Sequence, residues 1–436
     1  MNPTRRTVLA GAGAVSLSTL LASCAGFTGQ SNQGSGKGGS GSKTLSFTTW
    51  GSDQEKTAYQ QLIKEFEAAN KGVTVKLSIV PYEQAFTNLD AQLQAGKAPD
   101  IFRLGYGQIG GYSDKNVLLD LSPYFSSSEA DAFQPQFWQA VKYQGKPYGV
   151  PQQTDTSALV YNTKMLKDAG ITSVPDSLEN AWSFDEFTQV LEKLRKNMDA
   201  KHFPFADNWQ LAGAFRWLTW LFSTGGRILS SDLKSPAIVS PQGTKALDYT
   251  RDFFAKQYVP QNNSTKSNTY ADTTWLAGTT AMVSAGTFLL PGFTGAKFEW
   301  GVTYLPKDVR GADDLGGNAL VASAASPNKD LAARFLKFMV SEKAMSTMCV
   351  TAFEQPTLKS LVGKDLGWKI QSGVMPVYLD QATTITPDDV AQISIPQFTS
   401  INTTLTNELE AAFRQGQSTS KTLSNIADGV TKALRS

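Results

Sequence analysis

The sequence predicts an α/β protein in which parallel strands are covered by helices. The pattern is clearest in residues 44–105, where segments with strand and helix periodicity alternate in the order β-α-β-α-β. Such alternation favours right-handed crossovers and a parallel sheet with helices on its faces. The part from residue 44 to 436 exceeds one typical domain, and 41% of the chain is hydrophobic, so we expect two domains with substantial cores.

Each element of this first region has its own signal. The run TLSFTTW at 44–50 has the apolar and β-branched residues of a buried strand. Residues 54–70 carry apolar side chains at helical spacing, with Ser52 or Asp53 available as N-cap. VTVKLSIV then alternates as a half-buried strand does, a helix opens after Pro81, and APDIFRL is predicted as a third strand. Ligands of such sheets bind beyond the carboxyl ends of the strands.

The rest of the chain continues this alternation. We expect, in order, a turn, an extended piece and a strand over 145–166, a helix over 183–197, a helix end, strand and turn over 274–293, a strand over 299–306, a helix over 326–345 with Pro327 in its first turn, and a mostly helical tail over 385–434.

The N-terminal segment predicts export and lipid anchoring. Residues 1–23 combine Arg5 and Arg6 with a mild apolar run, the layout of a signal peptide rather than of a membrane span. The arginine pair looks like a twin-arginine signal. Leu21-Ala22-Ser23-Cys24 resembles the bacterial lipobox, in which the cysteine receives a diacylglycerol, and the alternative is a cleaved soluble protein with a chance cysteine. Residues 24–43 would then be the lipidated Cys24 and a flexible Gly/Ser tether.

Composition excludes several classes of function. Two of the 40 basic residues lie in the predicted signal, which leaves 38 against 38 acidic residues, so nothing indicates a nucleic-acid partner. If Cys24 is lipidated, Cys349 has no disulfide partner, and we expect it to be a buried apolar residue on a helix. The single histidine, His202, lies in a turn-like segment without a pattern for a catalytic triad or a zinc site, so we expect no metal and no cofactor.

Four segments resemble extracellular solute-binding proteins of ATP-driven importers, family 1, the maltose-type sugar-binding group. They are APDIFRLGYGQIGGYSDKNVLLDL, GKPYGVPQQTDTSALVYN, AGTTAMVSAGTF and EWGVTYLP followed by GGNALVASAASPNKDLAARFLKFM.

The resemblance implies the type II periplasmic-binding-protein-like fold, with two lobes, each a sheet flanked by helices, that close over a sugar by bending at crossing strands. The crossings would lie near 152–157, 302–306 and 353–356. The N-terminal lobe would comprise 44–153 plus 304–354, and the C-terminal lobe 154–303 plus 355–436.

A sugar-binding site needs aromatic rings for the C–H faces of the sugar and polar side chains for its hydroxyls. Carboxylates are favoured because charge-assisted hydrogen bonds are the stronger ones. On the resemblance and these criteria, the residues that we expect at the ligand are Trp50, Asp53, Gln54, Arg103, Tyr106, Gln108, Asp155, Phe215, Arg216, Trp217, Trp275, Phe288, Asn318 and Glu354.

Some of these residues have a structural alternative. Asp53 is also suited to a helix N-cap, Asp155 to a hinge hydrogen bond and Trp217 to a helix core. This chain has Leu104 where the family has an aromatic residue, and Tyr106 is the candidate replacement, which indicates a substrate different from the family type.

The resemblance implies a receptor that captures a carbohydrate, most simply an oligosaccharide, and delivers it to a permease. We expect a monomeric, non-enzymatic lipoprotein on the outer face of the cytoplasmic membrane. One alternative cargo is glycerol-3-phosphate or another small polar solute. The alternative class is a lipid-anchored glycoside hydrolase, which would need two facing carboxylates such as Asp53 and Asp155.

Overall fold

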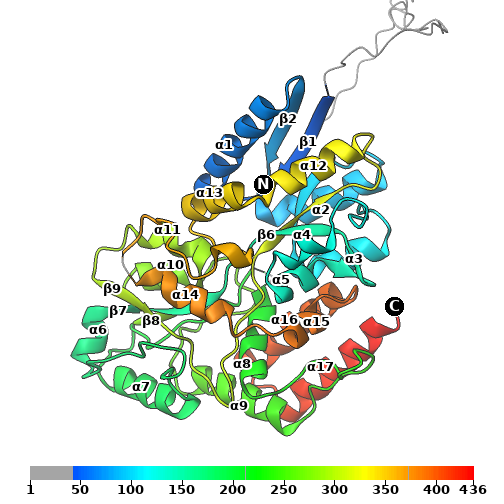
Figure 1. The fold of residues 1–436 in the computed structure, drawn as a ribbon. Helices are drawn as coiled ribbons and strands as arrows, with labels where there is room; N and C mark the ends of the chain where they lie inside the picture. The colour runs from blue at the N-terminus through cyan, green and yellow to red at the C-terminus, as the bar shows by residue number, and fades with distance from the viewer. Residues whose placement is uncertain (1–42, 212, 372) are drawn as a thin grey trace, which may run out of the picture. The chain divides into compact units, whose positions relative to one another are not determined.

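A computed structural model describes residues 43–211, 213–371 and 373–436 (Figure 1). The predicted signal peptide, Cys24 and the tether up to residue 42 lie outside the described residues. Lys43, which the sequence analysis places in the tether, is the first residue of strand β1 and pairs with Val73. Within the described ranges, no helix combines the length and apolar character that crossing a membrane requires.

A five-stranded mixed sheet lies in the half of the structure that begins with β1. Its order is β2-β1-β3-β10-β6, with β1 parallel to β2 and β3, and β10 antiparallel to β3 and β6. The strands are β1 (Lys43–Thr49), β2 (Val73–Ile79), β3 (Ile101–Gly105), β6 (Gly149–Gln153) and β10 (Asn318–Ala322). The parallel arrangement of the first three strands confirms the prediction. The antiparallel β10, which returns from far along the chain to lie between β3 and β6, was not predicted.

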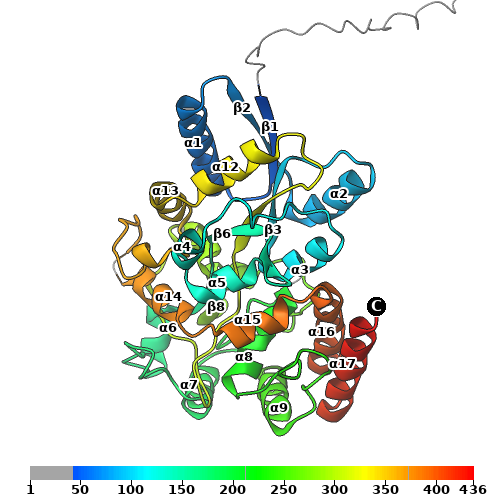
Figure 2. The same cartoon turned by 45° about the vertical axis from the view of Figure 1, so that its right-hand side comes forward.

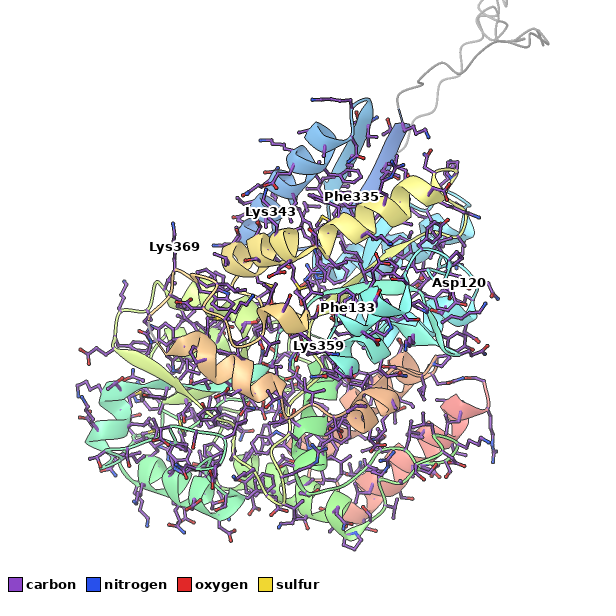
Figure 3. The ribbon with its side chains drawn as sticks, in the orientation of Figure 1. Asp120, Phe133, Phe335, Lys343, Lys359 and Lys369 are labelled. Carbon is purple, nitrogen blue, oxygen red and sulfur yellow. The ribbon has the colours of Figure 1, made fainter. Side chains whose placement is uncertain are left out.

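Helices cover this sheet as expected. They are α1 (Asp53–Ala69), α2 (Tyr82–Gln94), α3 (Tyr106–Asp114), α4 (Ser127–Asp131), α5 (Pro135–Ala140), α12 (Lys329–Met339) and α13 (Glu342–Ala352), with a small hairpin of β4 (Lys142–Tyr143) and β5 (Lys146–Pro147). Phe335 on α12 packs its ring 5.9 Å from that of Phe47 on β1 and 4.9 Å from that of Phe66 on α1 (Figure 3). Residues distant in sequence thus share one core, and a salt bridge between Lys343 and Glu65, 2.8 Å long, joins α13 to α1 at the surface.

The predicted helix over 326–345 is wrong at both ends. Pro327 precedes the N-cap, Asn328, and the helix stops at Met339. Ser341 then caps a separate helix, α13, because its hydroxyl accepts a hydrogen bond from the backbone N–H of Ala344 at 3.3 Å. The buried face of α12 is formed by Leu331, Phe335, Leu336 and Met339. Cys349 is buried on α13, as predicted.

A three-stranded antiparallel sheet organises the other half. Its order is β8-β7-β9, built from β7 (Ser157–Asn162), β8 (Met282–Gly286) and β9 (Trp300–Thr303). The helices around it and beyond it are α6 (Thr163–Asp168), α7 (Phe184–Lys196), α8 (Leu218–Ser223), α9 (Pro241–Ala255), α10 (Asp272–Leu276), α11 (Leu290–Phe293), α14 (Val374–Ala382), α15 (Pro387–Ile393), α16 (Phe398–Arg414) and α17 (Thr419–Leu434). In the part of the chain that the structure describes, 3₁₀ turns lie at Gly213–Trp217, Thr287–Leu289 and Lys359–Leu361. The helical tail is confirmed, and α16 packs against α17 and α9 (Figure 2).

The chain passes between the two sheets at three places that lie side by side. The backbone N–H of Thr154 donates to the carbonyl of Gln355 at 3.0 Å, and the N–H of Gln355 donates back to Thr154 at 3.1 Å. The hydroxyl of Thr154 donates to the carbonyl of Gly316 at 3.0 Å, which adds the segment before β10. A Cβ atom on Gly316 would overlap Asp155, and Gly317 has φ +92°, so this close approach requires both glycines.

The second crossing lies later in the chain than predicted. The sequence places it at 302–306, but residues 304–312 stay with the second sheet, where Lys307 N–H donates to the Trp182 carbonyl at 2.8 Å. The crossing follows this segment and runs from Asp313 to Asn318. Its Asp313 Oδ1 accepts from the backbone N–H of Ser157 at 3.0 Å, which fixes it to the first crossing.

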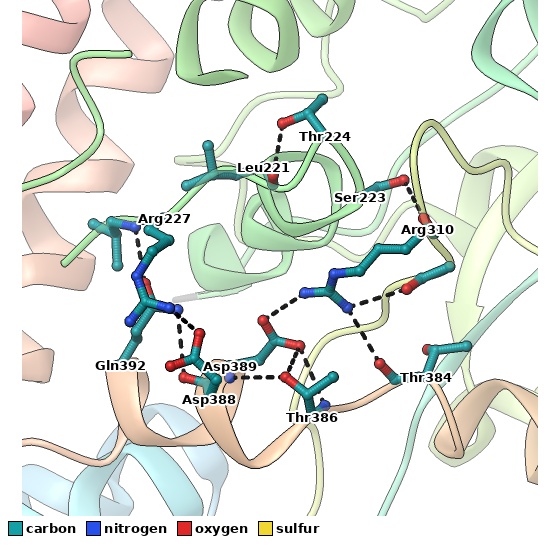
Figure 4. Close-up of polar contacts among 12 residues, drawn as sticks. Leu221, Ser223, Thr224, Arg227, Arg310, Thr384, Thr386, Asp388, Asp389 and Gln392 are labelled. Atoms are coloured by element: carbon teal, nitrogen blue, oxygen red, sulfur yellow. Dashed lines mark hydrogen bonds and ion pairs between the residues drawn. The ribbon is translucent and has the colours of Figure 1, made fainter. Parts of the chain in front are cut away.

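A polar network anchors α15 to the segment 304–312 and to the loop after α8 (Figure 4). Arg310 forms a 2.6 Å ion pair with Asp389, and Arg227 forms one with Asp388. Gln392 Oε1 accepts hydrogen bonds from the backbone N–H groups of Ile228 and Leu229, at 3.0 and 3.3 Å. Helix α15 is therefore held by the loops that follow α8 and β9.

Candidate functional site

The first part of the site lies at the carboxyl ends of β1 and β3. Arg103 is 4% exposed and forms a 2.6 Å ion pair with Glu55. Its guanidinium donates to the Trp50 carbonyl at 3.0 Å and lies 4.9 Å from the centre of the Trp50 ring. Burial is the largest single effect and lowers the pKa of Arg103, but the interactions with Glu55, Tyr59 and Glu354 together outweigh it, so the pKa is raised. Arg103 is therefore a permanent, oriented cation.

Trp50 and Asn318 complete this part. The Trp50 ring is half-buried and meets the rings of Tyr82 and Phe86 edge-on, with centroids 5.5 and 5.1 Å away. The Asn318 amide matches its neighbours when its oxygen faces Arg103, 2.7 Å from Nη2. The aromatic rings of Trp50, Tyr82 and Phe86 thus lie beside the polar side chains of Arg103 and Asn318.

The second part of the site is built around Arg216, in the 3₁₀ turn before α8. Its Nε lies 3.3 Å from Asp314 Oδ2 as an ion pair without hydrogen-bond geometry. The guanidinium carbon lies 4.8 Å from the centre of the Phe215 ring and 5.6 Å from that of Phe288. Phe288 in turn meets Tyr270 edge-on at 5.3 Å. Half-buried rings therefore surround a second oriented cation.

Two buried carboxyl groups, Asp155 and Glu354, lie at the crossings, and Asp155 interacts with both parts. Burial raises the pKa of Asp155 to about 7, Arg216 and Arg103 oppose this rise, and the carboxylates of Asp314 and Glu55 add to it. Burial also raises the pKa of Glu354 well above its usual value, and its Oε2 accepts from the Thr287 hydroxyl at 3.2 Å. Asp155 thus lies in the field of both arginines, at the junction of the two halves.

Unpartnered buried polar atoms gather in this region. Among the described residues they include Gln153 Oε1, Asp155 Oδ1, Gln210 Oε1 and both amide atoms of Asn208. More than about nine in ten buried polar groups in folded proteins have a partner, so such a cluster indicates a surface that binds something polar.

The structure brings together eight of the predicted residues. They are Trp50, Arg103, Asn318, Asp155, Phe215, Arg216, Phe288 and Glu354. Asp155 also has the hinge position that was its structural alternative.

Three predicted aromatic residues lie in the core instead. Trp217 is fully buried and its indole N–H donates to Thr250 Oγ1 at 2.9 Å, which matches the alternative of helix core. Trp275 is fully buried in a separate cluster, with Phe293 and Phe298 at 4.8 and 4.9 Å. Tyr106 is 1% exposed and its hydroxyl donates to the Gln153 carbonyl at 2.7 Å, so it braces a crossing and does not replace the missing aromatic at Leu104.

The remaining predicted residues lie at helix starts. Ser52, rather than Asp53, is the N-cap of α1, and Asp53 is exposed in the first turn with Gln54 half-buried beside it. Gln108 Oε1 accepts from the backbone N–H of Gly105 at 2.9 Å and so caps α3. No contact of Asp53 or Gln54 with the group around Arg103 supports their assignment.

Four members of the site were missed by the sequence analysis. Glu55 has the signature of a capping box, S-x-x-E, and it does bond the Ser52 N–H at 2.8 Å while it pairs with Arg103. Asp314 precedes the LGGN loop, and Tyr82 and Tyr270 stand at helix starts, so local patterns offered no signal for their role.

His202 is half-exposed beside Asp199, with Nδ1 2.7 Å from a carboxylate oxygen. In the described ranges, no set of three or more His, Cys, Asp or Glu side chains has an arrangement that would hold a metal ion.

Comparison with known proteins identifies the family to which this sequence belongs. The profile of the family described as bacterial extracellular solute-binding protein matches residues 50–346. A diacetylchitobiose-binding protein of Streptomyces coelicolor is 26% identical over 364 residues, which cover 78% of this chain and 79% of the relative. A maltodextrin-binding protein of Bacillus subtilis is 28% identical over 295 residues, 65% of this chain and 66% of the relative.

A solved structure supports the fold. An ABC transporter solute-binding protein of Thermotoga lettingae, bound with α-D-tagatose, aligns with a TM-score of 0.75 at 23% identity, and the alignment covers 90% of this chain and 100% of that one. The two-lobed type II fold follows from this likeness together with the two sheets and their crossings. The chain belongs to the family of bacterial extracellular solute-binding proteins.

Proposed function

We propose that this protein is the substrate-binding lipoprotein of an ABC importer and that it captures a neutral carbohydrate between its lobes. The observation that carries the proposal is the convergence of half-buried aromatic rings with unpartnered buried polar atoms around Asp155. Aromatic rings suit the C–H faces of a sugar, while Asp155, Glu354 and Asn318 suit its hydroxyls. The relatives named above are carbohydrate-binding proteins by description, which supports this choice.

The charge balance of the site argues against a phosphate cargo such as glycerol-3-phosphate. A dianion needs uncompensated cations or helix N-termini. Here Arg103 is paired with Glu55 and Arg216 with Asp314, and the buried carboxyls Asp155 and Glu354 add no positive charge. A neutral ligand is therefore favoured.

The carboxylates do not support the hydrolase alternative. A glycoside hydrolase needs two carboxyl groups that flank the scissile bond at a defined separation. Asp53 is exposed in the first turn of α1, whereas Asp155 is buried at a crossing. We therefore propose binding without chemistry, at an affinity near the micromolar range, about −8 kcal/mol.

We propose that the first lobe comprises 43–153 plus 313–354 and the second lobe 154–312 plus 355–436. These bounds differ from the sequence-based ones because Lys43 begins β1 and because 304–312 bond to the second half. Closure by bending at the three crossings would enclose the sugar. The monomeric receptor would be anchored through Cys24 at the outer face of the cytoplasmic membrane, where it meets its permease. Replacement of Cys24 by serine should release the protein from the membrane fraction, and unchanged fractionation would refute the anchor.

A thermal-shift screen tests the function. Purified residues 43–436 would be heated with monosaccharides, oligosaccharides and glycerol-3-phosphate. A bound sugar at about a hundred times its dissociation constant should add about 2.7 kcal/mol to the free energy of unfolding. A response to glycerol-3-phosphate alone would refute the carbohydrate assignment, and cleavage of a bound oligosaccharide by the purified protein would refute the receptor assignment.

A further inference from the structure

Buried acidic side chains around the three crossings outnumber the arginines beside them. Each of these carboxyl groups belongs to a residue that is at most 7% exposed. The set, called the carboxyl cluster, has six carboxyl groups and two guanidinium groups, from Glu55, Asp155, Asp207, Asp313, Asp314, Glu354, Arg103 and Arg216. If every member were ionised, the cluster would carry four net negative charges in an interior that water hardly reaches.

Both arginines of the cluster already have an acidic partner. Arg103 pairs with Glu55 at 2.6 Å, and Arg216 pairs with Asp314 at 3.3 Å. In the part of the chain that the structure describes, no ion pair links the other four carboxyl groups to a lysine, arginine or histidine. A buried carboxylate without a paired cation is so costly that the group binds a proton instead. Part of the cluster is therefore protonated in the folded protein.

Asp313 and Glu354 keep their protons at neutral pH. Asp313 Oδ1 accepts from the backbone N–H of Ser157 at 3.0 Å, which is a neutral partner. Glu354 Oε2 accepts from the neutral hydroxyl of Thr287 at 3.2 Å. Burial raises the pKa of both groups well above the usual range, and neighbouring carboxyl groups raise it further. Neither group therefore changes its charge near pH 7.

Asp207 is the member whose surroundings are fixed by the protein. Its Oδ2 accepts from the Trp220 indole N–H at 2.7 Å and its Oδ1 from the Ser284 hydroxyl, and both partners are buried. Burial raises the pKa of Asp207 to about 6, so most of it is ionised at pH 7. With Asp207 and the two paired carboxylates ionised against two arginines, the cluster around Asp155 carries one net negative charge.

Asp155 is the member whose proton a ligand can influence. Its Oδ1 is buried without a hydrogen-bond partner, and a Cβ atom on Gly316 would overlap this oxygen. Burial raises its pKa to about 7, so about half of the molecules hold the proton at neutral pH. The charged and titratable groups that interact with it are Arg216, Asp314, Arg103, Glu55, Glu354, Tyr82, Tyr106 and Tyr270.

A neutral sugar shifts the protonation of Asp155 in one direction. The bound sugar displaces water and brings no positive charge. Removal of water disfavours the ionised carboxyl group and strengthens its repulsion by the net negative charge of the cluster. The protonated group still serves the sugar, because it both donates and accepts hydrogen bonds. The sugar-bound protein therefore favours protonated Asp155.

We propose that Asp155 takes up a proton when the sugar binds, so that the protein captures its sugar more tightly at acidic pH than at alkaline pH. The proton comes from the buffer and ends on a carboxyl oxygen, and no bond of the sugar changes. The inference rests on the proposed function and deepens it, because the proton becomes a second ligand of the same site.

Calorimetry of sugar binding counts the protons. The probes are diacetylchitobiose and maltotriose, titrated into the purified protein at pH 7 in PIPES, MOPS and imidazole buffers, whose heats of ionisation differ. The slope of the observed heat against the heat of ionisation should give an uptake of about 0.3–0.4 proton per sugar. By the same linkage, the affinity should fall about three- to sevenfold from pH 6 to pH 8.5.

Asp155→Asn tests whether this residue holds the proton. The variant has no carboxyl group at this position, so the proton uptake should disappear. Asp131→Asn, at an exposed position on α4, is the matched control and should keep the wild-type uptake.

A second measurement does not depend on the affinity of the variant. Carbon NMR of labelled aspartate carboxyl groups follows each titration in the wild type, and the signal that Asp155→Asn lacks belongs to Asp155. This signal should titrate near pH 7 in the free protein and at higher pH with sugar bound.

The outcomes separate this inference from the proposed function. Sugar binding without proton uptake, or with proton release, refutes the inference and leaves the proposed function intact. Uptake that persists in Asp155→Asn, or titration of Asp155 near pH 4 in the free protein, also refutes it. Binding of glycerol-3-phosphate with proton uptake at Asp155, while neither sugar binds, refutes the carbohydrate function and supports the proton site. If none of the three probes binds, both proposals fail.

Discussion

Phe288 and Arg216 show how a binding surface is assembled from weak contacts. The guanidinium is held by Asp314 and lies near two rings, so its direction is set although only one ion pair holds it. Phe288 is half-buried and is therefore free on one side for a ligand. We propose that this ring stacks on the bound sugar.

We predict that Phe288→Ala weakens carbohydrate binding about 5- to 30-fold. The loss combines sugar stacking with the contact that orients Arg216, together about 1–2 kcal/mol. Titration calorimetry with the sugar found in the screen measures it. Trp275→Phe is the matched control, because Trp275 is fully buried among Phe293 and Phe298 and should affect stability but not affinity. Equal effects of both variants on affinity would remove Phe288 from the site.

Asp155 is a carboxyl group held in an environment that disfavours its charge. Burial raises its pKa from 3.8 to about 7 despite the opposing fields of Arg216 and Arg103. The carboxyl group of Asp155 therefore binds its proton more tightly in the folded protein than in the unfolded chain. Its contribution to the free energy of unfolding is fully present below about pH 4 and is lost as the pH rises to about 7. At neutral pH the buried carboxylate of Asp155 therefore lowers the free energy of unfolding.

Asp155→Asn should therefore flatten the pH dependence of the free energy of unfolding between pH 4 and 7. At pH 8 the variant should be more stable than the wild type, by a few kcal/mol at most. Urea titrations at pH 4.5, 5.5, 6.5 and 8 measure the difference. Asp53→Asn, at an exposed position, should leave the curve unchanged. Parallel curves for Asp155→Asn and wild type would contradict the raised pKa.

Helix α3 is packed unusually closely against the segment between α15 and α16. Cβ atoms on Gly107 and Gly110 would overlap the Phe398 ring and the backbone of Ser394 to Pro396. Figure 2 shows α3 beside α16. The glycines on one face of α3 therefore allow its backbone to contact the backbone of the C-terminal segment 394–396 directly.

Gly110→Ala should lower the free energy of unfolding by about 1–3 kcal/mol, because the added methyl group meets backbone that cannot rotate away. Gly292→Ala is the matched control. That position is also helical, but nothing lies within 4 Å of the added Cβ, so the change should be neutral or slightly stabilising. Denaturant unfolding of both variants decides, and equal stabilities would show that α3 and the tail are not rigidly packed.

Each of the three crossings carries buried carboxyl groups. Asp155 lies on the first, Asp313 and Asp314 on the second, and Glu354 on the third. Hydrogen bonds join the second crossing to its neighbours. Asp314 Oδ1 accepts from the Ser157 hydroxyl at 2.7 Å, and Asp313 Oδ2 accepts from the side-chain amide of Gln381 on α14 at 2.9 Å. The proposed ligand contacts and the proposed hinge therefore lie on the same segments, so we expect binding and bending to be coupled.

Sugar binding should bring the two halves closer. Labels at Lys76→Cys on β2 and Lys196→Cys on α7, both exposed, report the distance by energy transfer, and buried Cys349 should not react. Transfer should increase on adding sugar, because closure replaces ligand–water contacts by contacts to both lobes. A pair at Lys76→Cys and Lys97→Cys within one half should not change. No change in either pair at saturating sugar would contradict closure.

The sequence alone determined the local elements and the family. Periodicity was sufficient for β2, α1 and α2, because each has an apolar face that shows in the spacing of side chains. The strands β1 and β3 were recognised from their short runs of apolar and β-branched residues. The lipobox and the tether, which lie outside the described residues, stay predictions from the sequence. Asp155, Arg216 and Phe288 were proposed from the sequence because they stand beside recognisable motifs, and their role at a ligand stays a prediction.

Only the tertiary structure decided which polar and aromatic residues meet. In the segment 208–229 apolar residues occur all around, so spacing did not show that Trp217 is core while Phe215 stays half-buried. The place of β10, the break between α12 and α13 at Ser341, and the pairing of Arg216 with Asp314 depend on contacts between residues far apart in the chain. Local patterns specify which face of an element is apolar, whereas the partner of that face is selected by packing and by the pairing of buried charges.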